Sequence, residues 1–412
     1  MDDEIYIADK ATLDEVKVTT DKIYDILKGN DCYGFIEHCA IKDPDSRIEA
    51  IGINKNYTNL TVDKANHTFS LGSWATFPVL VENKPYMVKS NGAEDYQLSE
   101  TDYTKKADGV TASDVADDTY DGGAFSKLIR IYRKQEWVGH DRIVLFSFEE
   151  KEGFTADGFG DAPCRWIPMY YGSIDTNGKA HSTANTHLSQ SKTTAEQYTA
   201  IQTFSTGAKF FGGPIVEVIV DLLMMWAGTS DLQGAYGSGN MSGYVADAGQ
   251  DYGMKTNDVV NGGQFYGSSD GASLNKILHS VVLGSYSQWM RDPYEVIVNG
   301  AVKVSKDYTY DPTGATYEDT GIRVPNSEGW HFPLDYYPVK GYGSVPIAPY
   351  SGGSTAEGPC DGTYISGSQG SITAVCLRFG SCDYGAPDGV RARNWVNAAS
   401  NASWSIGFAL FL

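Results

Sequence analysis

Cysteine and histidine are scarce in this sequence of 412 residues, and neither is arranged as metal sites require. The six cysteines show no CxxC spacing, and the seven histidines include no HExxH motif. Zinc sites and thiol–disulfide active sites depend on such spacings, so the common forms of both are excluded. We expect no metal or cofactor, and thiols that are mostly reduced. A disulfide between Cys32 and Cys39, which flank a short apolar segment, is the less favoured alternative.

Basic residues are also in short supply. The chain has 32 lysines and arginines against 52 acidic residues, which gives a net charge of −20. An acidic surface repels phosphate backbones. The single basic cluster, residues 127–134, has its charges separated by apolar side chains, as on the polar face of a strand or helix. The sequence therefore indicates no nucleic-acid partner.

No long apolar run is present. The longest, residues 214–227, is broken by Glu217 and Asp221 and is too short to span a bilayer. The chain opens Met1-Asp-Asp-Glu, without the basic and apolar regions of a signal peptide. We therefore expect synthesis in the cytoplasm and no membrane insertion.

Glycine and tyrosine, by contrast, are plentiful, with 45 and 27 copies. Glycine suits the turns of β-rich structure, and tyrosine offers a large contact area with few torsions to restrain. Residues 1–30 have an acidic, helix-like pattern and are expected to form an attachment segment. Residues 31–125 are expected to form a small β-rich module, followed by a larger domain over residues 126–412.

Local patterns predict several elements of the larger domain. An apolar helix is expected over residues 214–226, between Gly213 and Gly228, and a second helix over 272–289. Two β-branched runs meet at Asn299-Gly300, which predicts a hairpin over 294–305. Residues 306–370 are expected to form ordered loops or insertions. A final pair of strands is expected over 373–379 and 403–410.

Motifs that resemble catalytic sites have simpler explanations. Residues 267–271 (Gly-Ser-Ser-Asp-Gly) match GxSxG, but their flanks have loop composition rather than the strand and helix of a nucleophile elbow. His181 and His187 lie in a Ser/Thr-rich stretch, where solvated loop residues are more common than ligands. His279 has an apolar neighbourhood typical of a core position. Cys376 falls on the buried side of a predicted strand.

The C-terminal segment combines a regular framework with chemically unrelated residues between its fixed points. The framework consists of Leu377-Arg378, Gly380, Gly385, Gly389-Val390, Asn397, Ser400-Asn401, Trp404 and Ile406-Gly407. This pattern, over most of residues 377–410, resembles the variable region of proteins diversified by phage and bacterial retroelements. Residues 84–123 are similar to a module of structural or tail proteins of gut phages.

The first resemblance implies a fold and a binding surface. The fold would be α+β, with a C-type lectin-like domain of the formylglycine-generating-enzyme branch. The ligand-binding positions between the framework residues would be Phe379, Ser381, Cys382, Asp383, Tyr384, Ala386, Asp388, Arg391, Arg393 and Trp395. Diversification of Asn-type codons can produce most of these residues but not Trp395, and relatives have Trp where this chain has Cys382. Since a core tolerates unrelated side chains poorly, we expect the variable side chains to face solvent.

The resemblance also implies a role and its alternatives. The protein would be a non-enzymatic structural component of a phage tail or virion that binds a host-surface protein or glycan. It would contact other tail proteins and form a homo-oligomer, with a trimer as the working expectation. The alternatives are an enzyme, either an oxidase of the same fold branch or a hydrolase, and a bacterial surface adhesin. An enzyme is less favoured because the sequence shows no coherent catalytic set. An adhesin is less favoured because no secretion signal is recognised at the start of this sequence.

Overall fold

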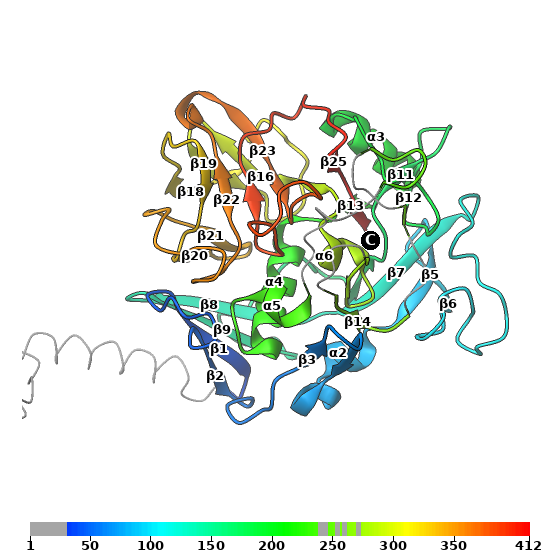
Figure 1. Ribbon diagram of the computed structural model, residues 1–412, viewed down its shortest axis with the longest axis horizontal. Coiled ribbons are helices and arrows are strands. Elements are labelled where there is room, and N and C mark those ends of the chain that lie inside the picture. The colour runs from blue at the N-terminus through cyan, green and yellow to red at the C-terminus, as the bar shows by residue number, and fades with distance from the viewer. Residues whose placement is uncertain (1–30, 238–245, 252–255, 258–261, 269–272) are drawn as a thin grey trace, which may run out of the picture.

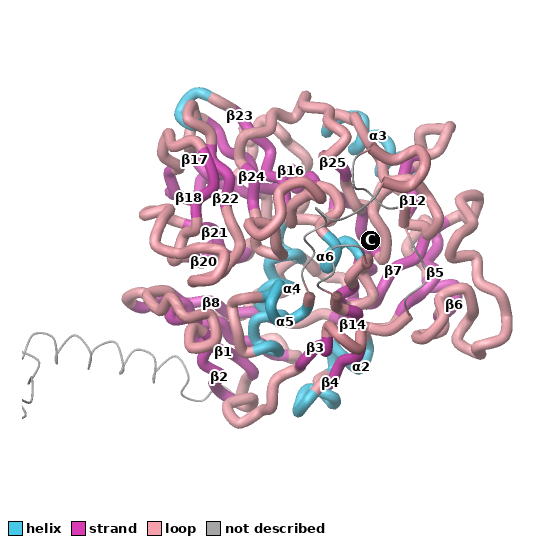
Figure 2. The backbone as a smooth tube through the Cα atoms, in the orientation of Figure 1, coloured by secondary structure: helices cyan, strands magenta, loops and turns pink. Residues whose placement is uncertain are grey.

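The computed structural model describes residues 31–237, 246–251, 256–257, 262–268 and 273–412. Within these residues the fold is mixed α+β, with mostly strands and few helices, and it includes a sheet curled into a half-barrel (Figures 1 and 2). The α+β class expected from the sequence is therefore confirmed. The helix expected in residues 1–30 lies outside the described residues.

Two four-stranded antiparallel sheets are formed by the first half of the described chain. The first has the order β2-β1-β9-β8, with β2 at Ile48–Gly52, β1 at Tyr33–His38, β9 at Asp141–Ser147 and β8 at Tyr132–Val138. The second has the order β10-β7-β5-β6, with β10 at Cys164–Pro168, β7 at Gly122–Ile129, β5 at Pro85–Lys89 and β6 at Glu94–Gln97.

These sheets mix the two regions that the sequence suggested as separate domains. β1 pairs with both β2 and β9, and β7 pairs with both β5 and β10. The expected boundary near residue 125 falls inside β7. One buried cluster extends from Phe35 to Phe411, so residues on both sides of that boundary share a core.

An eight-stranded sheet is built from the C-terminal part of the chain. β16 and β23 lie side by side near its middle, and β25 runs parallel to β16. The strands in order are β18 (Glu318–Arg323), β17 (Ala301–Val304), β16 (Trp289–Val298), β23 (Thr373–Arg378), β24 (Arg393–Asn394), β22 (Thr363–Ile365) and β19 (Gly329–His331), with β25 at Ile406–Gly407. The hairpin predicted at Asn299-Gly300 joins β16 to β17, and both residues have the positive φ that its turn requires.

The remaining elements are short. Five strand pairs are β3 (Thr61–Asp63) with β4 (Thr68–Ser70), β11 (Ser173–Ile174) with β12 (Ala180–His181), β13 (Lys209–Phe210) with β26 (Leu410–Phe411), β14 (Phe265–Tyr266) with β15 (Lys276–Ile277), and β20 (Tyr336–Val339) with β21 (Gly343–Pro346). The helices are α2 (Pro78–Glu82), α3 (Thr194–Phe204), α4 (Gly213–Ala227), α5 (Leu232–Tyr236) and α6 (Val281–Ser285), with 3-10 turns η1 (Gly72–Thr76) and η2 (Gln369–Ser371). Residues 306–370, expected as loops, thus contain five short strands, β18 to β22.

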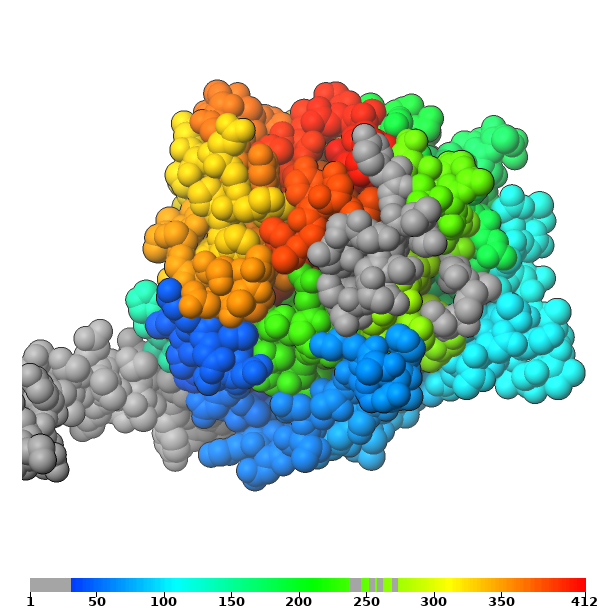
Figure 3. All heavy atoms as spheres, viewed as in Figure 1, coloured from blue at the N-terminus to red at the C-terminus, as the bar shows by residue number. Residues whose placement is uncertain are grey.

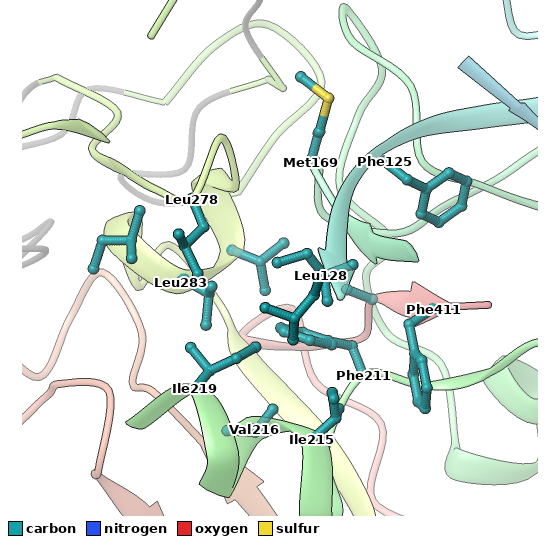
Figure 4. Packing of buried hydrophobic residues seen from close by; sticks show 14 of the residues in the cluster. Phe125, Leu128, Met169, Phe211, Ile215, Val216, Ile219, Leu278, Leu283 and Phe411 are labelled. Atoms are coloured by element: carbon teal, nitrogen blue, oxygen red, sulfur yellow. The ribbon is translucent and has the colours of Figure 1, made fainter. Parts of the chain in front are cut away.

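The apolar helix predicted over 214–226 is α4, and every one of its 15 residues is buried. Proline stands in its first turn, and Gly228 ends it in the left-handed conformation, donating its N–H to Met224 O. Figure 4 shows Ile215, Val216 and Ile219 among side chains from β7, α6 and β26. α4 is therefore a central element of the core.

The second predicted helix, over residues 272–289, is wrong. Of its described part, only Val281–Ser285 is helical, and it lies between β15 and β16. Leu278, His279 and Tyr286 have positive φ, which a continuous helix does not allow. A segment buried on all sides carries an apolar pattern that does not distinguish helix from strand.

The last predicted strand pair is confirmed in its first member. β23 covers Thr373–Arg378. Residues 403–410, expected as one strand, contain the two-residue strand β25 and only the first residue of β26.

All six cysteines are described, and all are free thiols. Among the described helices, none has both the length and the apolar character needed to span a bilayer.

Candidate ligand-binding surface at the C-terminal loop

The framework glycines make close contacts that hold the loop between β23 and β24. A Cβ added to Gly389 would lie 1.8 Å from Asp361 Oδ1, and one added to Gly380 would lie 2.0 Å from Asp388 Cγ. Gly389 N–H also donates to Phe379 O at 2.7 Å, which joins the two ends of the loop. Gly380 and Gly389 of the sequence framework are therefore required by packing.

The loop divides into an exposed tip, residues 383–387, and two buried flanks, residues 379–382 and 388–395. At the tip, Asp383, Tyr384 and Ala386 are exposed, and Tyr384 has 38% of its surface accessible. Figure 3 shows orange-red atoms from this part of the chain near the middle of one molecular face. The expected binding positions that reach solvent are thus close together in sequence.

The expectation that the variable side chains face solvent is wrong for most positions. Seven of the ten expose 4% of their surface or less: Phe379, Ser381, Cys382, Asp388, Arg391, Arg393 and Trp395. In this conformation these side chains cannot contact a ligand outside the molecule. Their chemical diversity reflects different buried neighbours.

Ion pairs explain why the two arginines of this loop, Arg391 and Arg393, are buried. Arg393 Nη2 donates to Glu217 Oε1 at 2.7 Å, and Nε donates to Glu295 Oε1 at 3.2 Å. Arg391 Nη1 donates to Glu37 Oε1 at 2.9 Å, and its guanidinium lies over the Tyr336 ring at 3.8 Å. Buried charges are retained where they are paired and hydrogen-bonded in this way.

These pairs belong to two buried groups of linked ion pairs, each of which includes a carboxylate of α4, and which we together call the ion network. Glu217 and Asp221, the two charges of α4, are both members. Guanidiniums and carboxylates are equal in number: Arg47, Arg133, Arg142, Arg378, Arg391 and Arg393 against Glu37, Asp157, Glu217, Asp221, Asp292 and Glu295. Burial alone would raise the pKa of Glu217, but Arg393 and Arg378 lower it to about 2.

The other buried positions pack or bond inside the fold. Trp395 Nε1 donates to Glu295 Oε1 at 2.6 Å, and Phe379 lies beside Phe211, with 6.4 Å between ring centroids. Asp388 Oδ2 accepts from Ser381 N–H at 3.1 Å. Burial raises the pKa of Asp388 well above its ordinary value, so this carboxyl is protonated more readily than a solvated one.

Tyr384 joins two further aromatic side chains at the surface. Its ring centroid is 5.6 Å from Trp330, and Trp330 is 5.4 Å from Tyr364. Both of these are half-buried and come from β19 and β22, while the fully buried Trp289 contacts Tyr384 and Trp330 from β16. We call Trp330, Tyr364 and Tyr384 the aromatic patch. Tyrosine and tryptophan at such positions dominate many protein interfaces.

Sequence reasoning identified Tyr384 but missed the other two members of the patch. Trp330 stands beside His331, whose ring nitrogens bond the backbone oxygens of Ser327 and Tyr350. Nothing in the pattern around Tyr364 distinguishes it from other strand tyrosines. Pairing of β22 with β19 and β24 brings these residues together.

The other candidate groups are accounted for by internal contacts. His279 is buried and bonded to Tyr103 Oη at 2.8 Å, and burial lowers its pKa to about 3. His181 is also buried, contrary to the expected solvated loop, and bonds Asp175 at 3.1 Å, whereas His187 is exposed. The expected core thiol at Cys376 is confirmed, and burial raises its pKa. Ser269, the serine of the GxSxG match, lies outside the described residues.

No metal-binding group of three or more His, Cys, Asp or Glu side chains occurs in the part of the chain that is described. Comparison of the sequence with models of protein families, and with curated proteins, found no match to either.

Proposed function

We propose that this protein is a virion-associated, receptor-binding component of a phage, and that it binds a host-surface ligand through the exposed tip and the aromatic patch. The observation that carries the proposal is the exposure of Tyr384 beside Trp330 and Tyr364. Three aromatic side chains at one surface supply contact area at little conformational cost. The C-terminal framework adds the resemblance to diversified, C-type lectin-like proteins.

Diversification, in this proposal, acts mainly at Asp383, Tyr384 and Ala386. These side chains reach solvent, and a surface position accepts most substitutions with little change in stability. Arg391 and Arg393 have fixed buried partners, so exchanging them at random would leave carboxylates unpaired. The buried flanks would hold the tip in place, and the tip would carry specificity.

Several copies on one particle would compensate for weak binding at each site. A patch of three aromatic residues is small compared with a stable protein interface. Linking such sites on one virion raises the overall affinity by multivalency. A homo-oligomer, with a trimer as the working assumption, suits this role, as does attachment to other tail proteins.

Adsorption to host cells tests the binding role. Tyr384→Ala should reduce adsorption of particles carrying the protein by about tenfold, the effect of losing one interface hot spot. Tyr337→Ala is the matched control, because Tyr337 is a tyrosine of similar exposure, 41%, on β20. Equal adsorption by both variants, with the fold intact, would remove the aromatic patch as the binding surface.

Sequencing the gene from many individuals of one lineage tests diversification separately. Substitutions should be concentrated at codons 383, 384 and 386, with a near-copy template and a reverse transcriptase gene nearby. Substitutions spread evenly over 379–395, or none at all, would contradict a diversified tip.

A further inference from the structure

A polar cavity lies at a different part of the molecule from the aromatic patch. It has a volume of about 600 Å³ and lies between β8, the segment after β9 and the turn joining β20 to β21. A second cavity, of about 360 Å³, shares Thr155, Asp157 and Gly341 with it. Sites for small molecules commonly measure roughly 300–1,000 Å³, so the larger cavity alone is of sufficient size.

The floor of this cavity is built from buried charges. Arg133, which is 1% exposed, donates from Nε and Nη2 to the same oxygen of Asp157, Oδ2, at 2.9 and 2.8 Å. Its Nη1 donates to Asp221 at 2.7 Å. The guanidinium is thus fixed by the network around α4, and it holds Asp157 in one orientation.

Asp157 has a second oxygen that is not satisfied. Oδ1 is buried and has no hydrogen-bond partner among the described residues, although Asp157 lines both cavities. A buried acceptor without a donor is unfavourable, and native structures supply such atoms with a water or a ligand. At the floor of the cavity, Asp157 Oδ1 therefore lacks a hydrogen-bond donor.

The walls of the cavity are mostly polar. Apart from glycines, its lining residues are all charged or hydrogen-bonding, and none is aliphatic or aromatic. Such a lining offers an apolar ligand little apolar surface, whereas a ligand rich in hydroxyls can both donate and accept.

The charge at the rim is opposite in sign to that of the whole chain. Three lysines stand at the rim, Lys134, Lys151 and Lys340, against the two carboxylates Glu136 and Glu152, in a protein of net charge −20. Lys134 pairs with Glu136 at 3.5 Å, but the exposed Lys340 forms no ion pair within the described part of the chain. The rim thus favours a ligand that carries negative charge.

We propose that this cavity binds an anionic saccharide. One sugar hydroxyl donates to Asp157 Oδ1, and the acidic group of the sugar lies at the lysine rim. Hydroxyls combined with an acidic group satisfy the unpaired acceptor, the polar walls and the lysines of the rim together. The site uses none of the residues of the aromatic patch, so it goes beyond the proposed receptor-binding role and does not depend on it.

Calorimetric titration of the full chain tests this assignment. The probes are trigalacturonate and a sulfated heparin tetrasaccharide, with neutral maltotriose and inorganic sulfate as controls. At least one acidic saccharide should bind at least tenfold more tightly than maltotriose and sulfate. No binding by either acidic saccharide overturns the proposal, as does equal binding by maltotriose or by sulfate.

Variants then locate the site. Lys340→Ala should weaken binding of the acidic saccharide by about fivefold, the effect of one charged contact at an exposed rim. Lys55→Ala, which removes an exposed lysine elsewhere, should leave it unchanged. In Asp157→Asn the Arg133 donors retain the amide oxygen, so the amide N–H₂ replaces Oδ1 and the acceptor is lost. This variant should weaken binding about tenfold.

Lys340→Ala keeps the proposal testable where Asp157→Asn fails to fold, since Lys340 is exposed and outside the ion network. Unchanged binding in Lys340→Ala overturns the proposal. Tyr384→Ala should leave the titration unchanged. Loss of saccharide binding in that variant would place the saccharide on the aromatic patch and equally overturn the assignment.

Discussion

The exposed tip and the buried flanks of one C-terminal loop differ sharply, although nothing in their composition separates them. Asp383 and Asp388 are the same residue type five positions apart, yet one is exposed and the other is completely buried. The tip ends in solvent beside the aromatic patch, whereas the flanks reach into the ion network around α4. A stretch of chemically diverse residues is therefore no evidence by itself of a surface.

The largest effect is expected where a charge is placed in the buried flank. Ala392 is 0% exposed, and Ala392→Asp would bury a carboxylate without a partner. We expect loss of soluble folded protein, equivalent to more than about 4 kcal/mol. Soluble yield and circular dichroism measure it. Ala386→Asp is the matched control at the tip and should fold normally; if both variants fold, residues 388–395 are not packed as described.

Removal of one arginine should have the next largest effect. Arg393→Ala leaves Glu217 and Glu295 with one cation fewer, and breaking a buried ion pair of this kind costs about 3–5 kcal/mol. Urea unfolding gives the value. Arg323→Ala breaks the exposed pair with Asp319 and should change nothing measurable. Similar midpoints for the two variants would contradict a stabilising network.

Acid should weaken the protein through the same network. The pKa of Glu217 is lowered from 4.5 to about 2 in the fold, so its contribution is present above pH 4.5 and is lost as pH falls from 4.5 towards 2. A shift of this size corresponds to roughly 3 kcal/mol. The pH dependence of the free energy of unfolding should be shallower in Glu217→Gln. Identical slopes would show that Glu217 is not the titrating group.

The smallest effect is expected at the tip. Ala386 is exposed, so Ala386→Arg and Ala386→Tyr should each change the free energy of unfolding by less than about 0.5 kcal/mol. Thermal unfolding measures this directly. The same substitutions at Ala392 should be strongly destabilising, because they add volume and charge to a packed site. A large loss at Ala386 would mean that the tip is structural.

Short-range sequence signals were enough to predict those parts of the fold that neighbouring residues in the chain determine. The hairpin at Asn299-Gly300 follows from two residues that adopt positive φ with little strain. α4 follows from an apolar run that begins at a proline and ends before a glycine. The framework glycines of the C-terminal loop were recognised from spacing alone, and their contacts with Asp361 and Asp388 supply the reason.

The residues that were wrongly expected to face solvent are buried for reasons that are not local in the sequence. Arg391 looks like a surface residue, since arginine is seldom buried without a partner. Its partner Glu37 is 354 residues away in the sequence, and that of Arg393, Glu217, is 176 away. No short segment of sequence around either arginine contains these carboxylates. The false helix over 272–289 has the same origin, because burial on all sides removes the polar stripe that defines a helix face.

The sequence by itself determined the α+β class, the central helix, the hairpin and the glycine framework of the C-terminal loop. It also placed Tyr384 among the candidate binding residues. Only the tertiary structure decided which residues of that loop face solvent, and that Trp330 and Tyr364 lie beside Tyr384. The physical reason is that backbone conformation depends on neighbours in the chain, whereas the burial of a charge depends on partners that meet it only after folding.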